Sequence, residues 1–164
     1  AEDWPGALSR RNPDFRGVRW DDSVTVPVTT LDALIEQYGL PRFCKIDVEG
    51  YEAEVLAGLS HRIPALSVEF VLGALDVAEA CVRRLETLGG YEFNVVEGEE
   101  RSFMSKRWLT ADDMVGWLRG GGVSVTSGDV YARLTPDAAW DGEPDGGAAR
   151  GRGSDPGTGN SNDG

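Results

Sequence analysis

The sequence alternates short apolar runs with segments of helical periodicity, and this alternation constrains the fold more than any other feature. Apolar runs at 42–48, 65–71 and 91–96 predict strands, and segments 51–59 and 76–88 between them place apolar residues at helical spacing. Strand–helix–strand alternation of this kind is typical of parallel sheets with right-handed crossovers. We therefore expect an α/β fold whose sheet is mostly parallel and has helices on both faces.

Residues 24–28 alternate valine with Thr and Pro and predict a short strand, which Pro27 confines to a sheet edge or a bend. A helix is expected to follow, capped by Thr29 or Thr30, because Thr29 and Asp32 have the spacing of a capping box. Its predicted inward face consists of Leu31, Leu34, Ile35 and Tyr38.

Two further elements are predicted in the last third of the chain. Thr110 is expected to cap a helix, with Asp113 at capping-box spacing, and residues 129–134 alternate in the manner of a final strand. The predicted inward residues of this helix are Met114, Trp117 and Leu118. Glycines at 89–90 and 120–122 follow predicted helices, so they indicate helix ends and not a phosphate-binding loop.

Composition divides the chain of 164 residues into three parts. Residues 1–23 place aromatic residues irregularly among Pro, Asn and Arg, and we expect an irregular lead-in whose aromatics cover a sheet edge or line a cleft. Residues 24–135 hold the periodic segments and form the expected domain. Residues 136–164 contain no Val, Ile, Leu, Met or Phe and carry six acidic residues against two arginines, which predicts a disordered acidic tail.

Net charge and cysteine content narrow the functional classes. A formal net charge of -12 argues against nucleic acid and against an anionic membrane surface as partners, since both need Lys and Arg. Cys44 and Cys81 lie in apolar runs, and we expect two buried free thiols in a cytoplasmic protein. His61 is the single histidine, and no CxxC occurs, so a zinc site is not expected.

Charged residues interrupt the ends of two predicted strands. Lys45, Asp47 and Glu49 alternate along the run at 42–48 and would share one face, and Glu69 occupies the corresponding place in the next strand. The carboxyl ends of adjacent parallel strands meet at the crevice where open α/β sheets bind ligands. We therefore expect the carboxylates to converge there, where they suit a general base, hydroxyl binding or a divalent cation.

Three other interpretations of these residues stay open at the level of the sequence. Lys45 and Asp47 can form a structural ion pair while Glu49 caps the next helix. The cluster can also serve a non-catalytic domain whose acidic cleft binds a divalent cation or a partner. Finally, Asp47 and Glu49 are an adjacent carboxylate pair, about 6–7 Å apart on a strand, as a sugar hydrolase would require.

The ordered run of motifs resembles the C-terminal portion of FkbM-type methyltransferases. The motifs are Thr-Thr-Leu-Asp-Ala-Leu-Ile at 29–35, Lys-Ile-Asp-Val-Glu-Gly-Tyr-Glu at 45–52, Val-Leu-Ala-Gly-Leu at 55–59 and Leu-Ser-Val-Glu-Phe at 66–70. The resemblance is close over residues 24–72 and looser to Leu134. It implies a Rossmann-like class I methyltransferase sheet in which the first strands, with their cofactor-binding glycine loop, are missing.

The resemblance also implies an activity and roles for the clustered residues. The activity would be transfer of a methyl group from S-adenosylmethionine to a hydroxyl of a small-molecule acceptor, such as a sugar or natural product. Asp47 and Glu49 would be catalytic, with Asp47 also beside the cofactor, and Lys45, Glu52 and Glu69 would line the pocket. No metal is implied. Without the glycine loop we expect poor or no binding of S-adenosylmethionine by this chain. An incomplete sheet would expose an edge and apolar faces, which favours self-association.

Overall fold

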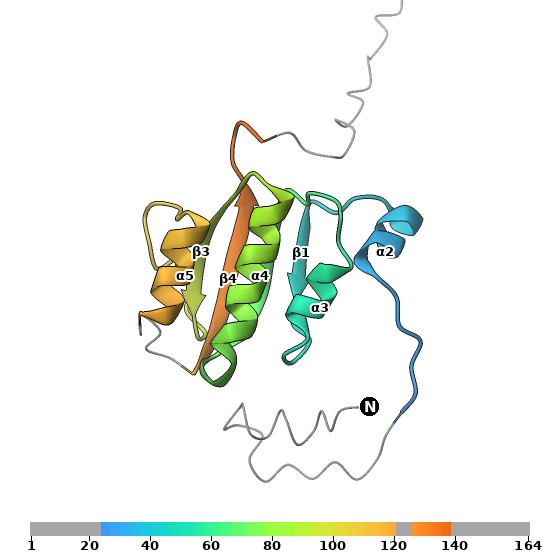
Figure 1. Ribbon diagram of the computed structural model, residues 1–164, viewed down its shortest axis with the longest axis horizontal. Helices are drawn as coiled ribbons and strands as arrows, with labels where there is room; N and C mark the ends of the chain where they lie inside the picture. The colour runs from blue at the N-terminus through green and yellow to red at the C-terminus, as the bar shows by residue number, and fades with distance from the viewer. Residues whose placement is uncertain (1–23, 121–125, 139–164) are drawn as a thin grey trace, which may run out of the picture.

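The computed structural model describes residues 24–120 and 126–138, which form a four-stranded sheet with helices packed against it (Figure 1). In their order across the sheet, the strands are β1 (Phe43–Ile46), β2 (Ala65–Val71), β4 (Ser127–Leu134) and β3 (Tyr91–Glu97). The helices are α2 (Leu31–Tyr38), α3 (Glu52–Ala57), α4 (Leu75–Leu88) and α5 (Ala111–Arg119), and a 3-10 turn, η2 (Leu72–Ala74), joins β2 to α4. The α/β alternation predicted from the sequence is confirmed in this part of the chain.

The sheet is mixed, which corrects the expectation of a mostly parallel sheet. β1 and β2 are parallel, whereas β4 lies antiparallel to both of its neighbours, β2 and β3. The reason lies in the connection before α5. Leu109 pairs with Phe93 near the start of β3, so the chain has already returned along β3 when α5 begins. α5 then leads back to the other end of the sheet, and β4 starts there in the opposite direction (Figure 1).

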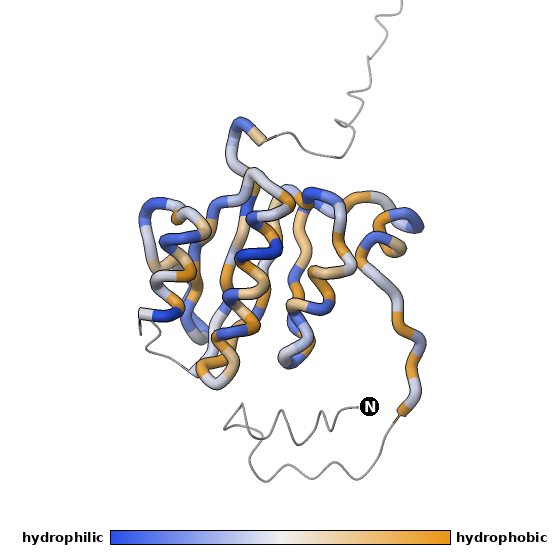
Figure 2. Tube along the Cα trace, viewed as in Figure 1, coloured by the Kyte–Doolittle hydropathy of each residue, from blue (hydrophilic) through white to orange (hydrophobic). Residues whose placement is uncertain are grey.

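Helices α3, α4 and α5 lie on one face of the sheet (Figure 1), so helices on both faces, as predicted, are not found within the described residues. The core lies between these helices and the sheet, and apolar residues follow the strands and the inner sides of the helices (Figure 2). Strands contribute Leu66, Val68, Phe70, Phe93, Val95, Val130 and Ala132 to it, and helices contribute Leu56, Ala78, Cys81, Val82, Leu85, Met114, Val115 and Leu118.

The N-terminus of α2 is capped by Thr30, whose hydroxyl accepts a hydrogen bond of 3.2 Å from a backbone N–H in the first turn. The predicted capping box with Thr29 is therefore wrong. Asp32 is held elsewhere, because its carboxylate accepts a 2.8 Å hydrogen bond from the N–H of Ser60 and lies 3.0 Å from Nδ1 of His61. These contacts tie α2 to the segment that follows α3.

Helix α5 agrees with its prediction in detail. The Thr110 hydroxyl accepts a 3.1 Å hydrogen bond from the N–H of Asp113, which is the predicted cap. Met114 and Leu118 are buried, and Trp117 is partly buried with its ring edge-on to a ring of β2, that of Phe70. This helix covers the β3 side of the core.

The predicted strand at 24–28 is wrong, because the segment has no strand partner among the described residues. Val24, Val26 and Val28 are 84%, 65% and 93% exposed. Alternation of apolar residues gives a strand only when another strand supplies the hydrogen bonds and a surface to bury one face. The segment instead leads to α2 as an extended, partly apolar stretch (Figure 2).

The predicted apolar face of α2 is only half correct. Leu31 and Ile35 pack against the core, but Leu34 is 39% exposed and Tyr38 is 74% exposed. α2 lies at the margin of the domain beside the β1 side of the sheet (Figure 1), so one stripe of the helix has no neighbour among the described residues.

Both cysteines are free, as predicted, but the prediction that both are buried is correct only for Cys81, because Cys44 is partly exposed. None of the helices within the described ranges is long and apolar enough to cross a membrane. The predicted lead-in at 1–23 and all but the first three residues of the predicted tail at 136–164 lie outside the described residues.

Candidate functional site: a carboxylate cluster where two parallel strands end

The first candidate residues lie in a short loop at the end of β1. The strand ends at Ile46 and not at Val48 as predicted, so Glu49 belongs to the loop and not to a strand face. Glu49 and Gly50 have φ angles of 56° and 98°, the left-handed region that a side chain rarely adopts. A turn this tight directs the Glu49 side chain back toward the end of the sheet.

Glu52 stabilises this loop from below. It is 2% exposed, and its Oε1 accepts hydrogen bonds of 3.1 Å from the backbone N–H groups of Val48 and Gly50. Two backbone donors of the loop, which lies partly exposed, thereby have an acceptor. Glu52 thus supports the loop that carries Asp47 and Glu49, and its carboxylate is directed at the backbone.

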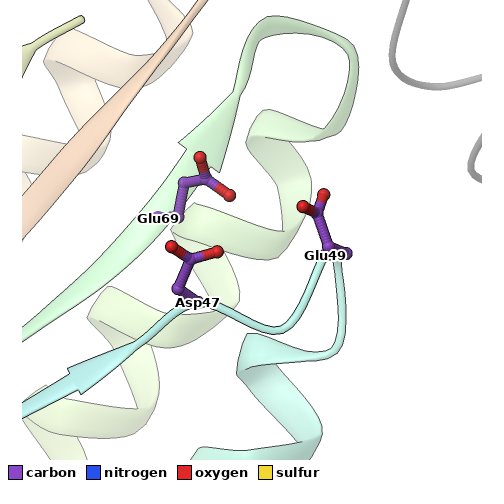
Figure 3. A group of neighbouring side chains, drawn as sticks. All are labelled: Asp47, Glu49 and Glu69. Atoms are coloured by element: carbon purple, nitrogen blue, oxygen red, sulfur yellow. The ribbon is translucent and has the colours of Figure 1, made fainter. Parts of the chain in front are cut away.

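Three carboxylates converge at this end of the sheet (Figure 3). Asp47 follows β1, Glu69 lies on the adjacent parallel strand β2, and Glu49 reaches over from the loop, so the predicted convergence is found. One carboxylate oxygen from each lies within 4.8 Å of the others. The parallel pairing of β1 and β2 produces this proximity, because both strands end at the same edge.

Lys45 connects the cluster to β4 through ion pairs with Asp47 and Asp129. Nζ of Lys45 lies 3.4 Å from Oδ2 of Asp47 and donates hydrogen bonds of 3.1 and 3.3 Å to the two carboxylate oxygens of Asp129. Asp129 is the cross-strand partner of Glu69 on β4. The predicted ion pair between Lys45 and Asp47 is present, and Asp129 is a member of the site that the sequence analysis missed.

Like charges raise the proton affinity of the cluster. Burial, the charges of Asp47 and Glu49 and a hydrogen bond with Asp47 raise the pKa of Glu69 from 4.5 to about 7, against the opposing charge of Lys45. Burial and the charges of Asp47 and Glu52 likewise raise the pKa of Glu49. Lys45 has a raised pKa because its bonds with Asp129 and Asp47 outweigh the opposing effect of its burial. Negative charge therefore exceeds positive charge at this site.

This arrangement is suited to binding a positively charged group. Two oxygens that bind one calcium ion at 2.3–2.6 Å lie at most about 5 Å apart, so the spacing of the three carboxylates is compatible with one cation. A sulfonium or ammonium group of an organic ligand would meet the same excess of negative charge. A carboxylate with a pKa near 7 can also take a proton from a hydroxyl group at neutral pH.

An α/β domain with polar side chains where adjacent parallel strands end belongs to a broad class of ligand-binding and catalytic folds. A comparison with known families narrows this class, because residues 3–122 match the methyltransferase FkbM domain. The match covers well over half of the chain, so the protein belongs to that family. The mixed four-stranded α/β sheet is compatible with a methyltransferase-like fold. None of the curated proteins searched matches the chain.

The match confirms the resemblance inferred from the sequence and begins earlier than the part that we identified as close. Of the five candidate site residues, the structure brings Asp47, Glu49 and Glu69 together, places Lys45 beside Asp47, and turns Glu52 into the loop. A signal for the missed residue was present, because Asp129 is a charged residue at the start of an apolar strand.

Proposed function

We propose that the protein is a methyltransferase that transfers the methyl group of S-adenosylmethionine to a hydroxyl of a small-molecule acceptor, such as a sugar or another natural product. Membership of the FkbM family carries this proposal. The convergence of carboxylates where β1 and β2 end supports it, because the sulfonium of the methyl donor is cationic and a carboxylate can accept the hydroxyl proton. Two free thiols suit a reducing compartment, so the proposed place of action is the cytoplasm.

The described residues fit the methyl donor in part. The carboxylates of Asp47, Glu49 and Glu69 provide negative charge for the cationic end of S-adenosylmethionine. Within residues 24–120 and 126–138, the turns from strand to helix after β1 and β2 contain no glycine-rich loop that would hold the other end. We therefore expect the cluster to orient the reactive centre of the cofactor.

Each residue has a proposed role. Bound S-adenosylmethionine would supply the methyl group. Asp47, held by Lys45 and facing Glu69, would orient the acceptor hydroxyl. Glu69, whose pKa is raised to about 7, is the side chain best matched to hold the hydroxyl proton at neutral pH. Glu49 would add a further negative charge to the site from its loop. Lys45, Asp129 and Glu52 would position these groups without touching the acceptor.

Calorimetric titration with S-adenosylmethionine tests the proposal, together with a radiolabelled methyl-transfer assay on a panel of hydroxylated sugars and phenols. We expect measurable binding to the wild-type chain and a loss of at least tenfold in affinity in Asp47→Asn. Glu100→Gln, which removes a carboxylate from an exposed turn, is the matched control and should bind like the wild type. Binding that is absent in the wild type, or equal in Asp47→Asn, would contradict the proposed role of the cluster.

A second candidate function is the binding of a divalent cation, favoured by the three carboxylate oxygens within 4.8 Å of one another. Thermal unfolding with and without Mg²⁺ or Ca²⁺ separates it from the first. A site of this kind raises the melting temperature with increasing cation concentration, and Asp47→Asn abolishes the rise. If the cations raise the melting temperatures of wild type and Asp47→Asn equally, the effect is unspecific.

A further inference from the structure

The face of the sheet opposite α3, α4 and α5 carries aromatic side chains that contact one another. Tyr131 points to this face, because its neighbours Val130 and Ala132 are buried against the helices on the other one. Its ring centroid lies 6.2 Å from that of Phe43 and 5.3 Å from that of Phe103, and a further ring lies 5.1 Å beyond Phe103. We call these four residues the aromatic row: Phe43, Tyr131, Phe103 and Trp108.

The aromatic row and the carboxylate cluster lie on the same face of the sheet. Asp129 precedes Tyr131 by two residues on β4, so both side chains point to one face, about 7 Å apart along the strand. Glu69 is the cross-strand partner of Asp129 and shares this face. The side chain of Lys45 reaches from β1 across β2 to Asp129, so its apolar stem crosses this face as well. A molecule that lies on Tyr131 therefore has carboxylates at one end.

Phe103 brings apolar surface close to the carboxylates. It lies in the segment that returns along β3, where the N–H of Met104 donates a 2.8 Å hydrogen bond to the carbonyl of Val95. The next residue of β3, Val96, is the cross-strand partner of Asp129. Phe103 therefore lies near the end of the sheet at which the carboxylates converge, and it is 45% exposed. Apolar walls with a few polar groups at one end are typical of small-molecule sites.

Within the described residues, the polar side chains that border the aromatic row offer little to a ligand. Asn94 is bonded to the backbone of Ser105, and Arg133 pairs with Glu92. Ser67 is fully buried. A ligand on the row therefore finds few partners for polar groups of its own, and each hydroxyl placed there without a partner weakens binding. A sugar, which has hydroxyls on every side, fits this surface poorly, whereas a flat apolar ring with a single hydroxyl fits it well.

We propose that the aromatic row binds the ring system of the methyl acceptor, and that this acceptor is a phenol without negative charge whose hydroxyl lies against Asp47 and Glu69. This assignment rests on the proposed methyltransferase function and narrows its class of acceptors. Offset and edge-on contacts with Tyr131 and Phe103 stabilise a bound aromatic ring. The excess of negative charge at the cluster repels phosphorylated, sulfonated and carboxylated acceptors. A phenol, with a pKa of about 10, also loses its proton more readily than an aliphatic alcohol, which suits a carboxylate as the proton acceptor.

Equilibrium dialysis of the full chain without S-adenosylmethionine tests the proposal with three probes, which are β-naphthol, a sulfonate of β-naphthol and methyl glucoside. We expect β-naphthol to bind about tenfold more tightly than its sulfonate, because of the charge of the cluster, and methyl glucoside to bind too weakly to detect. Phe103→Ser removes an aromatic contact and should weaken the binding of β-naphthol about fivefold. Asp47→Asn removes one negative charge and should reduce the discrimination against the sulfonate.

Tyr38→Ser is the matched control, since Tyr38 is an exposed aromatic residue on α2 outside the aromatic row, and this variant should bind β-naphthol like the wild type. Circular dichroism confirms that the variants fold; if Phe103→Ser does not, Phe103→Leu replaces it, because leucine keeps an apolar side chain without the ring. The proposal is overturned if the wild type does not bind β-naphthol, if it binds the sulfonate equally well, or if the Phe103 substitution leaves binding unchanged.

A methyl-transfer assay with the same probes and radiolabelled S-adenosylmethionine separates this proposal from the proposed function. Transfer to methyl glucoside in preference to β-naphthol overturns the assignment of the acceptor and leaves the methyltransferase function in place. Binding of β-naphthol that depends on Phe103, without any methyl transfer, supports the aromatic row as a binding site and contradicts the methyltransferase function of this chain.

Discussion

The part of the domain around β2 and α4, which we call the well-packed side, differs sharply in packing from the part around β1 and α2, which we call the thinly packed side. β2 lies between two strands under α4, and its residues Leu66 and Val68 are completely buried, whereas the edge strand β1 leaves Phe43 half exposed. α4 buries four residues, and α2 buries none. The carboxylate cluster lies across the junction, with Glu69 from the well-packed side and Asp47 from the thinly packed side. The well-packed side therefore fixes the position of Glu69. Asp47 and Glu49, on the thinly packed side, depend on local hydrogen bonds.

Truncating a side chain on each side of the sheet should produce the largest contrast. Leu85→Ala removes a fully buried side chain of α4 and should lower the free energy of unfolding by about 3 kcal/mol, through lost burial and a residual cavity. Ile35→Ala in α2 removes a partly buried side chain and should cost less than about 1 kcal/mol. Urea denaturation measures both values, and equal losses would refute the difference in packing.

Substitution of Glu52 should have the next largest effect on stability, because Glu52 supports the loop after β1 that carries Asp47 and Glu49. Glu52→Ala leaves the N–H groups of Val48 and Gly50 without their acceptor and should cost about 2 kcal/mol in unfolding free energy. Glu54→Ala, an exposed acid in the same first turn of α3, is the control and should change stability by less than about 0.5 kcal/mol. Similar values for the two variants would show that the loop does not depend on Glu52.

The sequence predicted the well-packed side of the fold better than the thin side. The strand at Ala65–Val71 and the inward residues of α4 follow from apolar periodicity, because the core that buries them is present within the described residues. Residues 24–28 have the same kind of periodicity, but without a neighbouring strand it produces no strand. The antiparallel direction of β4 depends on the path of the connection before α5, which composition does not encode.

The candidate site was predictable where it depends on strand ends and not where it depends on pairing across the sheet. Parallel neighbours bring Asp47 and Glu69 together, as strand alternation implied. Asp129 entered the site because β4 inserts beside β2, and the strand order was not available from the sequence. Glu52 was expected in the pocket with Glu49, but only the backbone donors of a tight loop explain its burial.

Glycine to alanine substitutions in the loop after β1 and in α5 should shift stability in opposite directions. Gly50 has a φ of 98°, so Gly50→Ala should lower the free energy of unfolding by about 1 kcal/mol through strain, although nothing lies within 4 Å of the added carbon. Gly116 in α5 also has free space, but it is helical, so Gly116→Ala should raise stability by up to about 1 kcal/mol. Thermal denaturation should show melting temperatures that shift in opposite directions; shifts of the same sign would contradict this account of the loop.

The smallest expected effect concerns the charge at the junction of the two sides. The folded protein raises the pKa of Glu69 from 4.5 to about 7, so folding favours the protonated carboxyl. This contribution to stability is fully present below about pH 4.5 and is lost as the pH rises through 7. Glu69→Gln keeps the neutral form at every pH, so the wild type should lose stability relative to this variant between pH 5 and 8. Partial solvent exposure keeps the difference below about 1 kcal/mol. Melting temperatures measured across this pH range test the direction of the difference in stability, with Glu100→Gln in the exposed turn as the control. If the stability of the wild type rises relative to Glu69→Gln with increasing pH, then Lys45, and not the neighbouring carboxylates, dominates the electrostatics at Glu69.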